Sequence, residues 1–148
     1  MTGTGILEVA AVCAALGYLG FTARAPSVLR SVLKTFSVAA LAIAALDQGA
    51  PLWLILGLAL CALGDYFLSR EGEKAFMGGV GAFALGHLAY VVLFLGHPSS
   101  DLGQIWVMPG LGLTGAIFAL GLVMMPILAP RAGDLKLPVL LYVPIILS

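Results

Sequence analysis

Five apolar stretches, each close to the length that crosses a lipid bilayer, follow one another along this chain of 148 residues. A transmembrane helix needs about 20 mostly apolar residues, because each residue advances the helix by ~1.5 Å and the hydrocarbon layer is ~30 Å thick. The second stretch is short and needs flanking residues to span. The stretches are Ile6 to Phe21, Val32 to Leu46, Leu52 to Ser69, Phe76 to Leu95 and Ile105 to Leu128.

A further apolar segment, from Pro138 to Ser148, is too short to cross a bilayer. The pattern therefore predicts an all-α fold, a polytopic transmembrane helix bundle of about five complete spans and the start of a sixth. The breaks between stretches are short, so consecutive helices are expected to be antiparallel neighbours. We expect residues 1–148 to form a single transmembrane domain.

The composition argues against a soluble globular domain and against a nucleic-acid-binding protein. Of all residues 61% are hydrophobic and 9% are charged, whereas a soluble globular domain has roughly 25% charged residues. The net charge is zero and no basic cluster lies outside the short loops, which argues against a nucleic-acid partner. Cys13 and Cys61 lie inside apolar stretches and read as packed side chains, without disulfide or zinc spacing.

The basic residues predict the topology. All seven fall in or beside the first, third and fifth loops, which the positive-inside rule places in the cytoplasm, with the N-terminus outside. Trp53 and Trp106 are then expected to open the third and fifth helices at the outer interface. The basic residues are Arg24, Arg30, Lys34, Arg70, Lys74, Arg131 and Lys136.

Three ionisable residues, Lys34, Asp65 and His87, are predicted at membrane depth. Such groups cost about 2.5–3.5 kcal/mol there and are candidates for function. Lys34 and Asp65 are expected at similar depth, about 6 Å from the same face, and can meet. Lys34 alternatively turns its ammonium to the interface. Asp65 is expected to face the bundle interior, either in a structural ion pair or in a functional site.

The fourth helix carries two stripes of residues spaced three or four apart. An aromatic stripe contains His87, which is expected near the bilayer centre as either a hydrogen-bonded structural residue or a pocket residue. No second histidine or carboxylate follows it at metal-ligand spacing. A stripe of small residues beside it predicts a close helix contact. The aromatic stripe is Phe76, Gly79, Phe83, His87, Tyr90 and Phe94, and the small stripe is Gly78, Ala82, Gly86 and Ala89.

These residues resemble a known family over about residues 30–95. The matching features are Lys34-Thr35, Leu63-Gly64-Asp65 with Leu68, and the fourth-helix residues Phe76, Gly79, Phe83, His87 and Tyr90. The family is that of the YhhN-like membrane proteins, whose characterised members are lysoplasmalogenases. The resemblance implies an eight-helix bundle, longer than this chain, and a second acidic residue with no counterpart at membrane depth in residues 96–148. We therefore expect a C-terminal part beyond Ser148.

The resemblance also implies a reaction, the hydrolysis of the vinyl ether bond of a lysoplasmalogen to a fatty aldehyde and a glycerophospho-alcohol. Asp65 is the candidate general acid, and Lys34 either holds the lipid phosphate or modulates Asp65. His87, Tyr90, Phe83 and Gly79 are expected to line the substrate cavity. No metal or organic cofactor is implied, and the protein is expected in the bacterial inner membrane, where it takes a lipid substrate from the bilayer.

Two other classes remain open from the sequence. A small transporter or channel would use Lys34, Asp65 and His87 as a polar relay. A non-catalytic lipid-binding bundle would use the same residues for packing alone.

Overall fold

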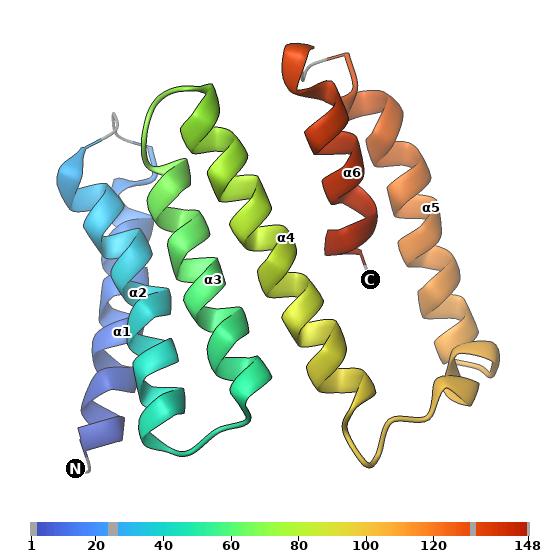
Figure 1. The fold of residues 1–148 in the computed structure, drawn as a ribbon, viewed down its shortest axis with the longest axis horizontal. Coiled ribbons are helices and arrows are strands. Elements are labelled where there is room, and N and C mark those ends of the chain that lie inside the picture. Colours follow the sequence, from blue (N-terminus) through green and yellow to red (C-terminus); the bar gives the residue numbers. More distant parts are fainter. Residues whose placement is uncertain (1–2, 24–26, 131–132, 148) are drawn as a thin grey trace. The chain divides into compact units, whose positions relative to one another are not determined.

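The chain is all-α. The computed structural model describes residues 3–23, 27–130 and 133–147, and within these ranges it contains helices and no strand (Figure 1). The predicted all-helical bundle is therefore confirmed. The helices are α1 (Gly3–Phe21), α2 (Val28–Asp47), α3 (Leu52–Leu68), α4 (Glu73–Leu95), the short 3₁₀ helix η1 (Leu102–Trp106), α5 (Gly110–Leu128), the 3₁₀ turn η2 (Gly133–Leu135) and α6 (Lys136–Ile146).

The helices form two compact units, residues 1–93 and 94–148, and the boundary falls two residues before the end of α4. In the first unit α1 to α4 run alternately up and down as neighbours, and the end of α1 and the start of α2 lie at the same end as the α3–α4 connection (Figure 1). In the second unit α5 packs against both α6 and η1. The prediction of a single domain stays a prediction.

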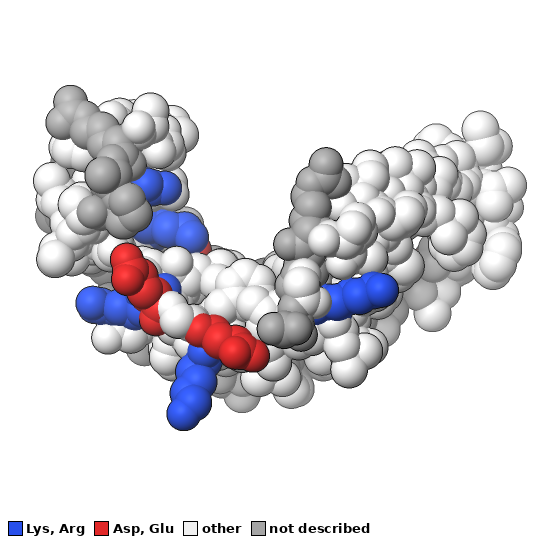
Figure 2. Space-filling view, turned by 90° about the horizontal axis from the view of Figure 1, so that it is seen from above, with Lys and Arg blue, Asp and Glu red and all other residues white. Residues whose placement is uncertain are grey.

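Charged side chains of both signs gather at the end of the first unit where the α3–α4 connection lies (Figure 2). Arg30 and Lys34 on α2, together with Arg70 and Lys74 around this connection, belong to that end. Arg24 and Arg131 lie outside the described residues. The common location of these four cations is what the charge pattern requires, whereas the side of the membrane that this end faces stays a prediction.

α2 begins earlier than the apolar stretch. Ser27 has an extended backbone, and its side chain accepts a hydrogen bond from the backbone N–H of Arg30, which satisfies one of the free donors of the first turn. The helix therefore starts at Val28, and the flanking residues do extend the short second stretch. Lys34 is consequently the seventh residue of α2, one turn deeper than a start at Val32 implies.

The predicted fifth span is wrong as one continuous helix. Ile105 and Trp106 belong to η1, and α5 begins only at Gly110. Pro109 has no backbone N–H and disfavours helical geometry at the residue before it, so the chain breaks there. Trp106 accordingly precedes α5 and does not open it, while Trp53 is the second residue of α3, as expected.

Three helices are long and apolar enough to cross a membrane, namely α2, α4 and α5. The apolar segments Gly5–Phe21 of α1 and Leu52–Leu68 of α3 are shorter, as is α6. Seventeen residues extend about 26 Å at ~1.5 Å per residue, slightly less than the hydrocarbon thickness. The apolar helices fit a membrane-integral protein, and the number of complete spans stays a prediction.

Glycines set the distance between α3 and α4. A Cβ atom added to Gly64 would lie 2.6 Å from the ring of Phe83, and one added to Gly57 would overlap the ring of Tyr90. On α4, a Cβ at Gly86 would lie 3.1 Å from Cys61 Sγ and 3.2 Å from the carbonyl oxygen of Gly57. The two backbones thus approach closely, as the stripe of small residues predicts.

The burial pattern on α4 refines that stripe. The buried residues are Gly79, Ala82, Gly86 and Ala89, so Gly79 and not Gly78 continues the small stripe toward the charged end. A Cβ atom added to Gly78 would instead lie in ordinary contact with the ring of Phe67. Gly79, assigned from the sequence to the aromatic stripe, thus lies in the helix interface.

We expect Gly86→Leu to destabilise the protein and Gly81→Leu to leave it unchanged or slightly stabilised. Gly86 faces backbone and sulfur of α3, whereas nothing lies within 4 Å of a Cβ at Gly81 of the same helix. Overpacking costs about 1–3 kcal/mol, while replacing an exposed helical glycine removes a penalty of up to about 1 kcal/mol. Thermal unfolding of the detergent-purified variants measures the difference, and equal midpoints would refute this close packing.

Candidate functional site

An ion pair joins α2 to α3. Lys34 Nζ lies 2.9 Å from Asp65 Oδ1, so the expectation from sequence that these two residues can meet is confirmed. The Asp65 residue is only 7% exposed, and the Lys34 side chain is 30% exposed. The carboxylate is therefore the enclosed partner, and the ammonium is the partner that reaches the surface.

Asp65 has no alternative to this pairing because of its position on α3. It lies three residues before the end of the helix, and the next charged residues, Arg70 and Glu71, are exposed in the α3–α4 connection. A short side chain cannot reach water from a buried position, whereas the long stem of lysine lets its ammonium approach from α2. Asp65 is the only buried charged or polar side chain among the described residues.

His87 has a hydrogen bond, which a histidine within the membrane requires. Its Nδ1 lies 2.8 Å from the carbonyl oxygen of Phe83, one turn earlier on α4. Its ring stands edge-on to that of Tyr90, with the centroids 6.3 Å apart. Within the described part of the chain, no three His, Cys, Asp or Glu side chains are grouped to hold a metal ion.

The other predicted cavity residues of α4 pack against α3. The ring of Phe83 lies over Gly64, the residue before Asp65, while Gly79 contacts Leu68. Tyr90 lies over Gly57, about two turns from Asp65, and its hydroxyl is 4.0 Å from Cys61 Sγ. Phe83 therefore supports the backbone that carries Asp65. The substrate-binding role of these residues stays a prediction.

Two pockets adjoin the ion pair, and none of the predicted α4 residues lines either of them. The smaller, of about 210 Å³, contains Lys34 in its wall together with cationic and acidic neighbours. Asp65 does not line it, so Lys34 stands between the carboxylate and this space. We call this smaller pocket the head pocket. Its described lining residues are Tyr18, Ser27, Arg30, Ser31, Lys34, Leu68, Ser69, Arg70 and Glu71.

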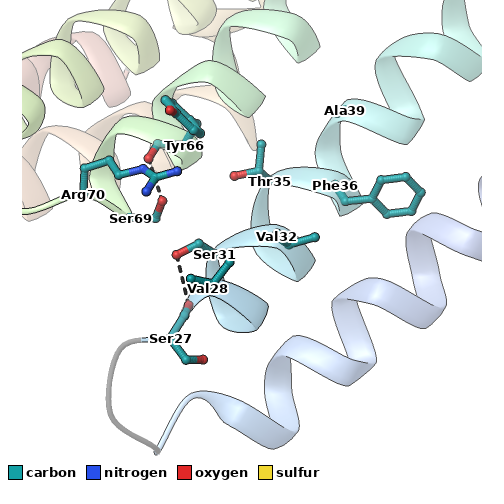
Figure 3. A pocket seen from close by; sticks show the side chains of 10 residues that line it. All are labelled: Ser27, Val28, Ser31, Val32, Thr35, Phe36, Ala39, Tyr66, Ser69 and Arg70. Atoms are coloured by element: carbon teal, nitrogen blue, oxygen red, sulfur yellow. Dashed lines mark hydrogen bonds between the residues drawn. The ribbon is translucent and has the colours of Figure 1, made fainter.

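The larger pocket, of about 540 Å³, lies along α2 and the end of α3 (Figure 3). It shares Ser27, Ser31, Ser69 and Arg70 with the head pocket. We call it the groove. Its lining residues are Ser27, Val28, Ser31, Val32, Thr35, Phe36, Ala39, Tyr66, Ser69 and Arg70.

The groove is absent from the sequence-based predictions, in which Arg70 enters only the topology and neither Ser27 nor Ser31 is a candidate. A signal was nevertheless present, because Ser27, Ser31 and Thr35 recur at steps of four and so form one row on a helix. Val28, Val32 and Phe36 form the adjacent row, at the same spacing. Two such rows, one hydroxylic and one apolar, give this part of α2 a polar and an apolar side.

Comparison with known proteins identifies the sequence. A sequence model described as the YhhN family matches residues 29–148. The resemblance seen over residues 30–95 is therefore confirmed, and it extends to the end of the chain. No curated protein and no solved structure matches the chain.

We expect Lys34→Met to destabilise the protein more than Asp65→Leu does. Removing the cation leaves an enclosed carboxylate unpaired, whereas removing the carboxylate leaves an ammonium that can turn toward water. Breaking a fully buried pair costs about 3–5 kcal/mol, and the partial exposure of Lys34 should bring the cost below that range. Thermal unfolding in detergent compares the two variants.

The double variant Lys34→Met/Asp65→Leu serves as the control for this asymmetry. It contains no unpaired charge, so its unfolding temperature should lie above that of Lys34→Met. A double variant less stable than either single variant would show that the pair is not what holds these positions together.

Proposed function

This chain belongs to the YhhN family, and on that premise we propose that it is a membrane-embedded hydrolase that cleaves the vinyl ether bond of lysoplasmalogens. One observation supports the proposal above all others: the enclosed carboxylate of Asp65 is paired with the more exposed ammonium of Lys34 beside a cavity. Cleavage of an enol ether needs a proton donor shielded from bulk water, and a carboxyl group in such a position can serve as one.

The pair provides a way to couple proton donation to substrate binding. A lysoplasmalogen carries a phosphate, and Lys34 lines the head pocket together with Arg30 and Arg70. When the phosphate binds there, it attracts the ammonium of Lys34 away from Asp65. In this proposal Asp65 acts in its protonated form, because cleavage of an enol ether requires a proton donor.

The protonated Asp65 transfers this proton to the vinyl carbon that is not bonded to oxygen. The carbon–carbon double bond supplies the electron pair, and the ether oxygen stabilises the resulting oxocarbenium ion. Water adds to the cation and loses a proton to the carboxylate of Asp65, which gives a hemiacetal. The hemiacetal collapses to a fatty aldehyde and a glycerophospho-alcohol. One water molecule is consumed, and Asp65 regains its proton.

The composition of the helices supports a substrate drawn from the bilayer. Large apolar side chains cover the outer surfaces of α1 to α5, among them Leu16, Ile43, Leu63, Leu85 and Leu122, each exposed in the structure. A single-chain lipid can reach the pair laterally while its head group stays at the charged end of the first unit. This route requires no opening to bulk water.

The test is fatty aldehyde release from lysoplasmalogen by the purified protein, measured with a carbonyl-reactive reagent. We expect Asp65→Asn to reduce the rate at least about 100-fold, the scale of loss when a general acid is removed. Asp47→Asn is the matched control, because Asp47 is an exposed carboxylate at the other end of α2, and it should retain the wild-type rate.

Equal rates for Asp65→Asn and the wild type would refute the assignment of Asp65. Absence of aldehyde from the wild type, with solute uptake into proteoliposomes, would instead support a transporter. Absence of both would leave a lipid-binding bundle without turnover.

A further inference from the structure

We propose that the groove binds a membrane phospholipid with one net negative charge and a hydroxylated head group, of which phosphatidylglycerol is the simplest example. The groove is distinct from the proposed catalytic pair, because neither Lys34 nor Asp65 lines it, although Arg70 lines both the groove and the head pocket. Its volume of about 540 Å³ falls within the range of roughly 300–1,000 Å³ that is usual for ligand pockets.

Arg70 gives the groove its charge. Its guanidinium lies 4.7 Å from the ring centroid of Tyr66, which holds it in place as a cation–π pair. Among the described residues Arg70 has no ion-pair partner, and it is the only formally charged residue that lines the groove. Its planar donors match the geometry of a phosphate. A phosphodiester with a single negative charge would balance it.

The serine hydroxyls favour a head group that donates hydrogen bonds. Ser31 Oγ donates to the carbonyl oxygen of Ser27 at 3.2 Å, and Ser69 Oγ donates to that of Tyr66 at 2.6 Å. The hydroxyl protons of Ser31 and Ser69 are thus already used, while their oxygens retain lone pairs that can accept. A glycerol head group offers hydroxyl donors to these oxygens, whereas a choline head group offers none.

A choline head group also lacks a site for its cation in the groove. No carboxylate lines the groove among the described residues. Tyr66, an aromatic ring suited to a quaternary ammonium, already has the Arg70 guanidinium beside it. An anionic, hydroxylated head group therefore fits better than a zwitterionic one.

The remaining wall suits an acyl chain. Val32 and Phe36 are 53% and 44% exposed, and with Val28 they form the apolar row of α2. Figure 3 shows that Val32 and Phe36 point away from Arg70, whereas the hydroxyl of Thr35 points toward it. A lipid lying along α2 would thus meet polar groups on one side and apolar groups on the other.

The hydroxyl of Thr35 independently indicates that the groove holds a ligand with polar atoms. Its Oγ1 is buried and has no hydrogen-bond partner among the described residues, an arrangement that is costly in a protein interior. Threonine in a helix populates two side-chain rotamers. Thr35 lines the groove, so a polar atom of a bound lipid would satisfy this hydroxyl.

The test is native mass spectrometry of the delipidated protein in detergent, mixed with phosphatidylglycerol and phosphatidylcholine of equal chain length. We expect phosphatidylglycerol to be retained preferentially in the wild type. Arg70→Gln should weaken its binding about tenfold, the effect of losing one charge-assisted contact, and bring it to the level of phosphatidylcholine. Lys74→Gln is the control, because Lys74 is an exposed cation at the same end that does not line the groove.

A second pair of variants tests the chain-binding wall. Val32→Ser should weaken the binding of both lipids, whereas Leu29→Ser should not, because Leu29 is equally exposed on α2 but lies outside the groove. Equal losses in Arg70→Gln and Lys74→Gln, or unchanged binding in Arg70→Gln, would overturn the proposal. Displacement of the lipid by soluble glycerol phosphate would also overturn it, because the site would then recognise a head group alone.

Discussion

The ion pair between Lys34 and Asp65 fixes how α3 faces its neighbours. A carboxylate within an apolar helix must find a cation, and Lys34 on α2 supplies one at 2.9 Å. Successive residues of an α-helix differ by about 100° in direction. With Asp65 directed at α2, Gly64 is left to receive Phe83 of α4, and Tyr66 turns toward the groove. One electrostatic requirement thus orients three faces of the helix.

The contact between α3 and α4 then follows from shape alone. In lipid no hydrophobic force draws apolar helices together, so close approach and dispersion contacts must do so. Gly57 and Gly64 on α3 are seven residues apart, as are Gly79 and Gly86 on α4. Each glycine receives a large side chain or a backbone atom of the other helix. The rings of Phe83 and Tyr90 are thereby committed to packing, and Asp65 is held on a well-supported backbone.

The charged end of the first unit combines two different environments. The head pocket is lined by Lys34 and by residues of both signs, whereas among the described residues Arg70 is the one charged residue of the groove, beside a long apolar wall. Four of the described residues line both pockets, so a change in the shape or charge of one pocket can alter the other. Polar and apolar lining residues thus lie side by side along one helix.

The sequence alone determined the all-helical fold, the approximate extent of the helices in the first unit, the small-residue contact and the similar depth that lets Lys34 and Asp65 meet. Each depends on local properties, namely apolar length, helical periodicity and depth counted from a helix end. Pro109 also marks the break in the sequence, because it has no backbone N–H to donate. The apolar stretch continues on both sides of it, however, and therefore predicted one helix.

Only the tertiary structure decided which faces meet. The serine and threonine row of α2 was visible as a repeat, yet its meaning depended on Arg70 and Tyr66 arriving opposite it from another helix. Similarly, periodicity placed Phe83 and Tyr90 on one stripe but did not say that glycines of α3 would receive them. Spacing along one helix fixes the directions of its own side chains, whereas the rotation and separation of two helices depend on interactions between them.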